Sequence, residues 1–335
     1  MEHKYVVTDL SLLAPWYTKH AAEPLMKFVP WWLPANIITL ISNFSVLLAL
    51  IVTILVTSGM FKFWLLVPAL IVIYATGDIL DGMQARRTKT CSKLGEYLDH
   101  FLDIFVNGML LSMLILIYGI TDQALTALYF GISYITLTCL YFEQHKNRVM
   151  FFEKIGAFEG IIILLVLFIL GFIESTKQFL LRDIIGQISI FDLLLIGITF
   201  GAFYTLKRSL ERAGSSANKG FVIFFLLTAA TAFLSTFLLP FPAIMFVMTA
   251  YCGSHAGKLH TAYLLKQKEP PADLIFPVFL AAAVLFRMPL SIALPSAIIY
   301  QVLNIIISFM AGFYPLRKHW LWLNPGPDFV DVYTT

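Results

Sequence analysis

Charged residues are scarce in this chain of 335 residues, since Asp, Glu, Lys and Arg make up 13% of it, about half of their share in soluble domains. Cysteine is also scarce, and the spacing of the three cysteines fits neither a disulfide framework nor a metal site. The net charge of +3 is too small to indicate a nucleic-acid partner, so none is expected. In contrast, 59% of the residues are hydrophobic, which excludes intrinsic disorder. The composition predicts an all-α, polytopic integral membrane protein folded as a helical bundle.

Ten hydrophobic segments are long enough for transmembrane helices, each of which needs about 20 residues to cross the hydrocarbon. They extend approximately over residues 34–57, 63–85, 97–120, 124–142, 158–174, 186–206, 220–239, 241–265, 273–293 and 295–316. The segment that precedes them, 1–33, is expected to lie at the membrane interface, because Trp16, Trp31 and Trp32 suit the headgroup region.

The basic residues indicate how these segments are oriented. If all ten cross the membrane, all but four of the 23 Lys and Arg residues fall on one side, and the exceptions are Lys62, Lys177, Arg182 and Arg287. Because basic residues gather on the cytosolic side, both termini are expected in the cytosol. The membrane would be the inner membrane of a bacterium, or the endoplasmic reticulum or Golgi of a eukaryote.

A cluster of acidic residues lies where the second segment ends and the third begins, in GDILDGMQARRTKTCSKLGEYLDHFLDIF (77–105). Asp78 and Asp81 are three residues apart on the second helix, so both project from one face. Asp99 and Asp103 are four apart on the third and share a face in the same way. The short connection predicts antiparallel neighbouring helices whose aspartates converge, and ionisable groups inside a membrane bundle indicate a functional site.

Four carboxylates this close cannot all remain ionised in a low-dielectric site unless cations neutralise them. Oxygen ligands favour Mg²⁺, Mn²⁺ or Ca²⁺ over zinc, and two such ions about 4 Å apart would hold a phosphoryl group and its leaving oxygen. Gly82, Ala85 and Gly95 are small enough to let a ligand approach the backbone closely. Arg86 can bind a phosphate through two hydrogen bonds. These residues predict a diphosphate site at the cytosolic membrane surface.

The same residues resemble the signature of the CDP-alcohol phosphotransferase family. Their order is Asp78-x-x-Asp81-Gly82-x-x-Ala85-Arg86, then eight residues, then Gly95-x-x-x-Asp99-x-x-x-Asp103. The segments GMQARRT, LGEYLDH and WWLPANIITL are similar to those of the choline/ethanolamine phosphotransferase branch. The resemblance implies two ions of Mg²⁺ or Mn²⁺, bound by Asp78, Asp81, Asp99 and Asp103. It also implies that CMP leaves from a donor whose CDP moiety is held by Asp81, Gly82, Ala85, Arg86 and Gly95.

The base that takes the proton of the acceptor hydroxyl has two possible identities. The segment EKIGAFEGI (153–161) resembles part of the same branch and aligns Glu159 with a catalytic glutamate. His100 titrates in a range that suits a general base, so His100 and Glu159 would act as a pair. The alternative is Asp103. Asn36 either contacts the nucleotide base or helps to begin the first helix.

The chain is expected to divide into functional parts. Residues 1–33 would form the interfacial segment, and 34–206 the catalytic transmembrane helices with the motif at 78–103. Residues 207–320 would form the remaining helices, which serve for acceptor binding or dimerisation, and 321–335 a C-terminal tail. The branch is often dimeric, so the resemblance implies a homodimer.

The implied function is the transfer of phosphocholine or phosphoethanolamine from a CDP-alcohol to the hydroxyl of diacylglycerol or a similar lipid, in phospholipid biosynthesis. Both substrates and the membrane lipids are the expected partners. A rival within the family transfers a phosphatidyl group from CDP-diacylglycerol to a small polyol. An intramembrane prenyltransferase would show a second Asp-rich motif, and a transporter would place ionisable groups near the membrane midplane on repeated helices. The sequence shows neither pattern.

A further polar group lies near the end of the eighth segment, in GSHAGKLH (253–260). His255, Lys258 and His260 would either contact a headgroup or a diphosphate or, in the simpler interpretation, extend along the helix end to the membrane interface.

Overall fold

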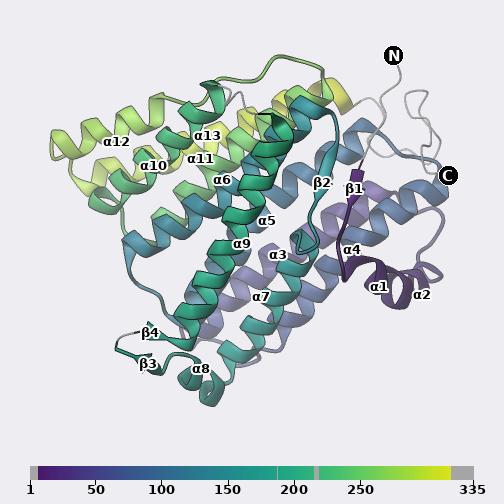
Figure 1. The fold of residues 1–335 in the computed structure, drawn as a ribbon, viewed down its shortest axis with the longest axis horizontal. Coiled ribbons are helices and arrows are strands. Elements are labelled where there is room, and N and C mark those ends of the chain that lie inside the picture. Colours follow the sequence, from purple (N-terminus) through teal and green to yellow (C-terminus); the bar gives the residue numbers. More distant parts are fainter. Residues whose placement is uncertain (1–6, 187, 215–218, 318–335) are drawn as a thin grey trace. The chain divides into compact units, whose positions relative to one another are not determined.

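The structure, a computed structural model, describes residues 7–186, 188–214 and 219–317. In these residues nearly all regular structure is helical, which confirms the predicted all-α class (Figure 1). The predicted tail at 321–335 lies outside the described residues, as do the first six residues of the predicted interfacial segment.

Seven helices of the described chain are long and apolar enough to cross a membrane. They are α3 (Ala35–Thr57), α4 (Leu66–Thr88), α5 (Lys93–Tyr118), α6 (Gln123–Asn147), α9 (Ile190–Ala213), α10 (Lys219–Leu238) and α13 (Leu290–Leu316). An eighth span results if α7 (Ala157–Phe172) and α8 (Glu174–Leu180), which meet at an angle of 111°, count as one. The protein is therefore a multi-pass membrane protein.

The two other predicted spans are helical but differ from simple membrane helices. The eighth predicted segment is α11 (Phe241–Leu264), whose second half is polar, and the ninth contains α12 (Ile275–Leu285), which has only 11 residues. Neither meets the criteria of length and apolarity that the seven long helices meet. All ten predicted segments therefore contain helix. In the described residues, however, only seven of them, or eight with the bent pair, form helices long and apolar enough to cross a membrane.

The predicted break between the ninth and tenth segments, at residues 293–295, is wrong. α12 ends at Leu285 and α13 begins at Leu290. Arg287 between them adopts a left-handed conformation with φ +51°, and the residue before Pro289 is biased against helix. The carbonyl of Pro289 accepts the first hydrogen bonds of α13, and Pro295 lies inside that helix.

The chain forms two compact units, each built from more than one stretch of sequence. Unit 1 contains Met1–Tyr118, Val149–Gln178 and Phe313–Thr335, and unit 2 contains Gly119–Arg148 and Phe179–Gly312. The boundaries expected at 33, 206 and 320 separate parts with different predicted functions and not compact units. This functional division stays a prediction.

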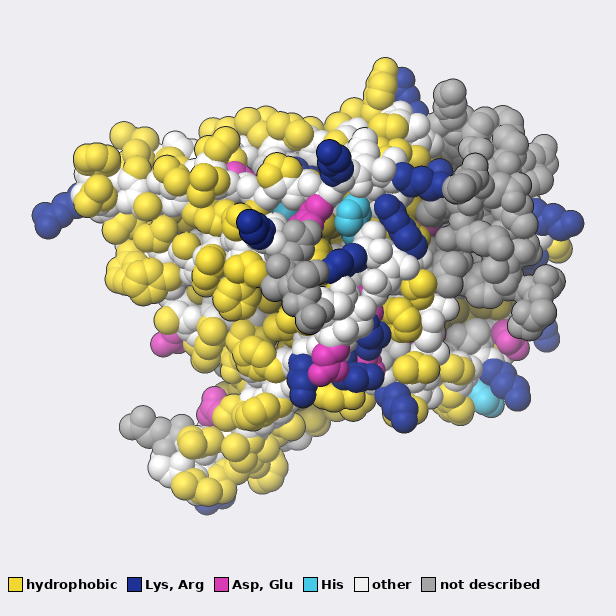
Figure 2. Space-filling model, turned by 45° about the horizontal axis from the view of Figure 1, so that its top comes forward, with side chains coloured by type: hydrophobic (Ala, Val, Ile, Leu, Met, Phe, Trp, Pro, Cys, Tyr) yellow, Lys and Arg dark blue, Asp and Glu magenta, His cyan; other side chains and the backbone are white. Residues whose placement is uncertain are grey.

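Unit 1 is organised around α3, on which both α4 and α5 pack. Gly77 of α4 lies so close to Ser42 of α3 that a Cβ at Gly77 would be 2.6 Å from the Ser42 Cβ. The opposite face of α3 exposes large apolar side chains, among them Ile41, Phe44, Ile51 and Ile54. On the face of the molecule shown in Figure 2, hydrophobic side chains cover broad areas and charged side chains gather in smaller groups. Such surfaces suit contact with lipid tails.

The beginning of the described chain folds back onto unit 1. The strand β1 (Val7–Asp9) pairs in parallel with β2 (Met150–Phe152), and Val7 lies opposite Met150. Three short helical turns follow: α1 (Ala14–Tyr17), η1 (Thr18–Ala22) and α2 (Glu23–Met26). The predicted interfacial segment is thus partly helical and is fixed at its start by a strand pair.

Unit 2 contains α6, against which α9, α10 and α11 pack. Before α9, the strands β3 (Asp183–Ile185) and β4 (Ile188–Ser189) form a small antiparallel pair. The hydroxyl of Ser189 and the carboxylate of Asp192 form a capping box at the start of α9. Asp192, which interrupts the sixth hydrophobic segment of the sequence, therefore begins the helix instead of lying within its apolar part.

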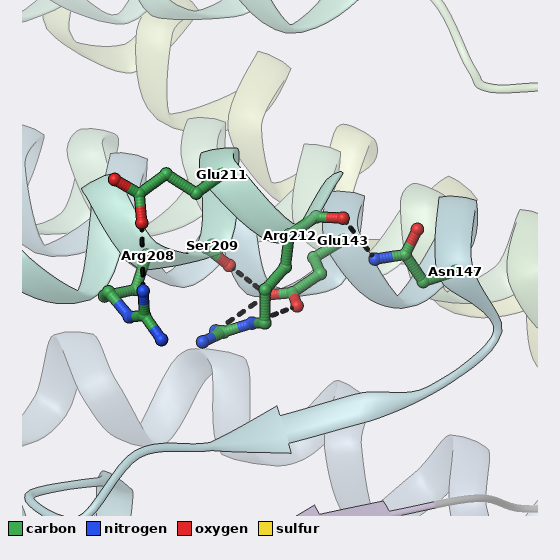
Figure 3. Close-up of polar contacts among 6 residues, drawn as sticks. All are labelled: Glu143, Asn147, Arg208, Ser209, Glu211 and Arg212. Carbon is green, nitrogen blue, oxygen red and sulfur yellow. Dashed lines mark hydrogen bonds and ion pairs between the residues drawn. The ribbon is translucent and has the colours of Figure 1, made fainter. Parts of the chain in front are cut away.

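A buried ionic cluster joins α9 to α6 (Figure 3). Glu143 is 1% exposed, and its Oε1 and Oε2 accept hydrogen bonds from Arg212 Nε at 2.5 Å and Nη2 at 3.1 Å. The hydroxyl of Ser209 donates to the same carboxylate, and the Asn147 amide donates to the carbonyl of Arg212 at 3.0 Å. A buried carboxylate with three such donors fixes the rotation of α9 against α6.

Replacing Glu143 with Leu should destabilise the protein more than replacing both Glu143 and Arg212 with Leu. The single change removes the counter-charge of a largely buried guanidinium, which costs about 3–5 kcal/mol, whereas the double change removes the charge itself. The measurement is the temperature of unfolding in detergent, with Arg208→Leu, which breaks the exposed pair with Glu211, as the matched control. Equal destabilisation by the single and double variants would contradict the prediction.

Candidate active site

The end of α4 turns the chain sharply toward α5. Lys89 is left-handed, with φ +57°, and its N–H donates to the carbonyl of Arg86 at 3.2 Å. The N–H of Thr90 donates to the carbonyl of Ala85 at 2.8 Å, which completes a Schellman motif. At the start of α5, the Ser92 hydroxyl accepts a hydrogen bond from the N–H of Gly95 at 3.1 Å. The predicted short connection is confirmed, and it brings the two motif-bearing helix ends to the same place.

The aspartates of α4 and α5 converge as predicted. The side chains of Asp78 and Asp99 lie close enough to interact directly across the two helices. Ligand atoms of Asp99, His100 and Asp103 lie within 4.8 Å of one another. Asp81 is 7% exposed and interacts electrostatically with Asp78 and Asp99. α4 and α5 both pack on α3, so their carboxylates approach one another beside the same helix.

The carboxylate cluster fits divalent cations. Asp99 Oδ1 is buried and has no hydrogen-bond partner in the part of the chain that the structure describes. Buried polar atoms are nearly always paired, so an orphaned carboxylate oxygen indicates a ligand outside the protein. Hard divalent cations take oxygen ligands of this type. The cluster therefore qualifies as a site for divalent metal ions.

Two residues that the sequence analysis did not identify support the aspartates. The hydroxyl of Tyr74, one turn before Asp78 on α4, donates to Asp103 Oδ1 at 2.9 Å. The hydroxyl of Thr39 on α3 donates to Asp81 Oδ2 at 2.5 Å. Hydrogen bonds of this kind orient ligating carboxylates. The sequence signal was weak, because Tyr74 and Thr39 resemble ordinary buried residues of apolar helices.

The small residues and the polar residues around the aspartates are also brought together. A Cβ on Gly82 would lie 3.3 Å from Nη1 of Arg86, so the guanidinium lies over this glycine. A Cβ on Gly95 would lie 3.2 Å from Oδ1 of Asn36, which places the start of α3 beside the start of α5. Ala85 follows Gly82 by three residues on the same helix and is partly exposed. Arg86 thus lies beside Gly82 on α4, and Asn36 lies beside Gly95 where α3 and α5 begin, while the binding of a CDP moiety by these residues stays a prediction.

His100 is 7% exposed, and its Nδ1 lies 3.8 Å from Asp99 Oδ2. This position is next to the carboxylates, where a base would be needed. Asp103 is a member of the same cluster and carries the hydrogen bond from Tyr74. The structure therefore keeps both candidates for the base within the site.

Glu159 has a different environment from the one that the sequence suggested. Its Oε1 accepts hydrogen bonds from the Ser11 hydroxyl at 2.6 Å and from the N–H groups of Leu12 at 2.9 Å and Leu13 at 2.8 Å. Its Oε2 accepts from the N–H of Gly156 at 2.9 Å, at the start of α7. Glu159 therefore holds the N-terminal segment, and its pairing with His100 stays a prediction.

Two motif residues without a predicted role also hold the N-terminal segment. The amide of Gln84 donates to the carbonyls of Pro30 at 3.0 Å and Leu33 at 2.6 Å. The guanidinium of Arg87 donates to the carbonyls of Met26 at 3.0 Å and Val29 at 2.7 Å, and it stacks over the ring of Trp31. Gln84 and Arg87 of α4 thus fix the segment that leads into α3.

Comparison with known proteins decides the family. Residues 32–196 match the family model described as CDP-alcohol phosphatidyltransferase. This range includes α3, α4, α5 and every residue predicted for the site. Residues 32–196 belong to the CDP-alcohol phosphatidyltransferase family. The resemblance found in the motif is therefore confirmed for the region that carries it.

Relatives of the chain within the CDP-alcohol phosphatidyltransferase family are named for phosphocholine and phosphoethanolamine transfer. Cholinephosphotransferase 1 of Bos taurus is 28% identical over 219 residues, which cover 62% of this chain and 52% of that protein. Choline/ethanolaminephosphotransferase 1 of Saccharomyces cerevisiae is 25% identical over 330 residues, with 87% and 83% covered. The match spans about half the length of the bovine relative.

Thr39→Val and Tyr74→Phe should each weaken cation binding by about tenfold or more, because losing a hydrogen bond to a ligating carboxylate costs about 10–100-fold in affinity. The measurement is calorimetric titration of Mn²⁺ into the purified protein. Thr53→Val is the matched control, since the Thr53 hydroxyl bonds only the carbonyl of Ala49. Unchanged Mn²⁺ affinity in both variants would contradict the supporting role.

Glu159→Gln should loosen the N-terminal segment, because an amide nitrogen cannot accept the hydrogen bonds that the carboxylate oxygens now accept. Hydrogen bonds to a charged group contribute about 1.5–3 kcal/mol each, so cleavage of residues 7–33 by a protease should accelerate about tenfold or more. Glu174→Gln, which alters a carboxylate bonded to Gln178, is the control. Equal cleavage rates in the two variants would contradict this role of Glu159.

Proposed function

We propose that the protein transfers phosphocholine or phosphoethanolamine from a CDP-alcohol to the hydroxyl of diacylglycerol or a similar lipid, and releases CMP. The observation that carries the proposal is the convergence of Asp78, Asp81, Asp99 and Asp103 at one place on two helices. The names of the relatives support phosphocholine or phosphoethanolamine as the transferred group.

Two ions of Mg²⁺ or Mn²⁺ would be held by Asp78, Asp81, Asp99 and Asp103. When bound, such ions offset the negative charge of a diphosphate and stabilise the leaving oxygen. Thr39 and Tyr74 keep two of these carboxylates in fixed rotamers, so the ligands are oriented before any ion arrives.

The donor would be held by residues around the carboxylates. Arg86 binds a phosphate oxygen of the CDP moiety, and the small residues Gly82, Ala85 and Gly95 let the diphosphate approach the helix backbones. Asn36 lies beside Gly95 and contacts the cytosine or its ribose. Asp81 contributes to this site in addition to its role as a metal ligand.

The reaction is an in-line displacement at the phosphorus distal to cytidine. His100, with Glu159 as the partner that the resemblance implies, accepts the proton of the lipid hydroxyl, whose oxygen then bonds to phosphorus while the bond to the CMP oxygen breaks. His100 is the preferred base because Asp103 is engaged by Tyr74 and by the other carboxylates. If the His100→Gln variant retained full turnover, Asp103 would be assigned as the base instead.

The orientation follows from the basic residues, with the site and both termini at the cytosolic side. The water-soluble donor and the released CMP would then exchange with the cytosol, while the lipid acceptor enters from the bilayer. The helices after residue 206 would serve acceptor binding or assembly into a homodimer, which stays a prediction from the resemblance.

Purified protein with Mg²⁺, diacylglycerol and either CDP-choline or CDP-ethanolamine should release CMP and form the corresponding phospholipid. Chelation of the cation should abolish turnover, and addition of Mg²⁺ should restore it. Asp81→Asn and Asp99→Asn should each lower turnover by more than about 100-fold, since each removes a charged ligand. Asp183→Asn, a change of an exposed carboxylate, is the control.

Two results would overturn the proposal. CMP release only from CDP-diacylglycerol with a small polyol would assign the protein to phosphatidyl transfer. Turnover that persists without divalent cations, or near-normal rates in both Asp variants at an unchanged unfolding temperature, would exclude the carboxylate cluster as the reacting site.

A further inference from the structure

The helix α12 in unit 2 is too short to cross a membrane, since 11 residues extend only about 16 Å. Its start is capped by Asp273, whose Oδ1 accepts hydrogen bonds from the N–H groups of Ile275 at 2.9 Å and Phe276 at 3.4 Å. The Tyr300 hydroxyl donates to the same carboxylate, at 3.0 Å from Oδ1 and 2.8 Å from Oδ2. Asp273 is therefore a fully engaged cap, and its charge lies at the positive end of the α12 dipole.

The start of α12 lies far from the end of α11. The Tyr251 hydroxyl donates to the carbonyl of Asp273 at 2.8 Å, and Tyr251 precedes Leu264, the last residue of α11, by 13 residues or about 20 Å of helix. The connection, residues 265–274, contains no helix or strand (Figure 1). It therefore runs back along α11 to a level about two-thirds of the hydrocarbon thickness away from the helix end.

Polar side chains from α11 and α13 meet between this level and the end of α11. Lys258 Nζ donates to Asn304 Oδ1 at 2.9 Å. Ser254 lies one turn before Lys258 on α11, and Gln301 lies one turn before Asn304 on α13, where both are completely buried. We call Ser254, Lys258, Gln301 and Asn304 the Lys258 cluster. Lys258 is half-buried and bonds to α13, and its place at the membrane interface stays a prediction.

The neighbouring histidines also lie inside unit 2. His255 stacks on Phe224 with ring centroids 4.2 Å apart, and His260 Nδ1 lies 3.2 Å from Gln144 Oε1. Both are at most 5% exposed, so these two side chains pack inside the protein and do not extend along the helix end to the membrane interface. Most of α11 is surrounded by protein, which explains why its polar half is compatible with a membrane helix.

Four polar atoms of the Lys258 cluster are buried without a hydrogen-bond partner in the described residues: Ser254 Oγ, Gln301 Nε2, Gln301 Oε1 and Asn304 Nδ2. Unpaired buried groups are rare in native proteins and indicate a ligand or water. Three of the four are donors. Asn304 Nδ2 belongs to the amide whose oxygen accepts from Lys258 Nζ, and Ser254 and Gln301 lie one helical turn from this contact on α11 and α13. The positive charge excludes a cation, and the donors suit an acceptor with several oxygens.

We propose that the Lys258 cluster binds an oxyanion, the carboxylate or phosphate of a small ion or of a lipid, and that water reaches it along residues 265–274. Backbone without regular structure at membrane depth occurs only where protein buries it or where it borders water. Exposed residues such as Gln267, Lys268 and Pro271 follow this path. The proposal is independent of the transferase reaction, because none of these residues belongs to the aspartate site.

Thiol labelling tests access and charge together. Ser254→Cys is made in a protein whose Cys91, Cys139 and Cys252 are replaced with Ala, and it is reacted with methanethiosulfonates that carry either a sulfonate or a trimethylammonium group. For each cysteine, the labelling rate with the sulfonate reagent is divided by the rate with the trimethylammonium reagent. This ratio should be about tenfold higher for Ser254→Cys than for Gln267→Cys, an exposed position on the connection 265–274, because a nearby ammonium attracts an anion. Lys258→Arg should keep this preference, and Lys258→Met should abolish it.

Competition identifies the source of the oxyanion. Protection of Ser254→Cys by inorganic phosphate indicates a small ion, and protection by oleate in detergent micelles indicates the carboxylate of a lipid. Gln301→Cys, from the facing helix, repeats the test if Ser254→Cys lowers the unfolding temperature. Ile299→Cys, on the exposed apolar side of α13, should react only with a lipid-soluble maleimide.

The proposal is overturned if both cluster cysteines react with the maleimide after unfolding but with neither charged reagent in the folded protein. It is also overturned if the preference for the sulfonate is the same in Lys258→Met as in the parent, or if neither phosphate nor oleate slows the labelling.

Discussion

The hydrogen bonds that end α4 at Lys89 and begin α5 at Ser92 determine where the acidic side chains lie. The left-handed residue reverses the chain within a few residues, so Asp81 and Asp99 face the same point from two helices. α3 then supplies the surface on which both helices pack, and it contributes Thr39 and Asn36 to the same place. A site built from three helix ends has fixed carboxylates before any ligand binds, which is what cation and diphosphate binding require.

Much of this site could be predicted from the sequence, because the motif is local. Spacings of three and four residues place Asp78 with Asp81 and Asp99 with Asp103 on single helix faces, whatever the rest of the chain does. Thr39 and Tyr74 could not be predicted in the same way. Each acts across a contact between helices, and a hydroxyl in an apolar helix more often bonds its own backbone, as that of Thr53 does.

The errors have a common physical cause. Hydropathy treats each segment as if lipid surrounded it, whereas α11 is largely surrounded by protein and tolerates the buried His255 and His260 and the half-buried Lys258. For the same reason, a hydrophobic run that includes α12 resembles a full span, although α12 ends at Leu285 and the run continues through a break into α13. Composition describes the environment of a residue only when the neighbours of its helix are known.

The attachment of the N-terminal segment links the first and the middle parts of the chain. Ser11, Leu12 and Leu13 bond to Glu159, and β1 pairs with β2, although nearly 150 residues separate the partners. α6, which belongs to unit 2, is synthesised between them. During translation, the contacts of the N-terminal segment with β2 and Glu159 therefore cannot form until α7 has emerged from the ribosome. α6 of unit 2 has been synthesised by then. Biogenesis of the two units is consequently interleaved, and contacts of such long sequence separation form late.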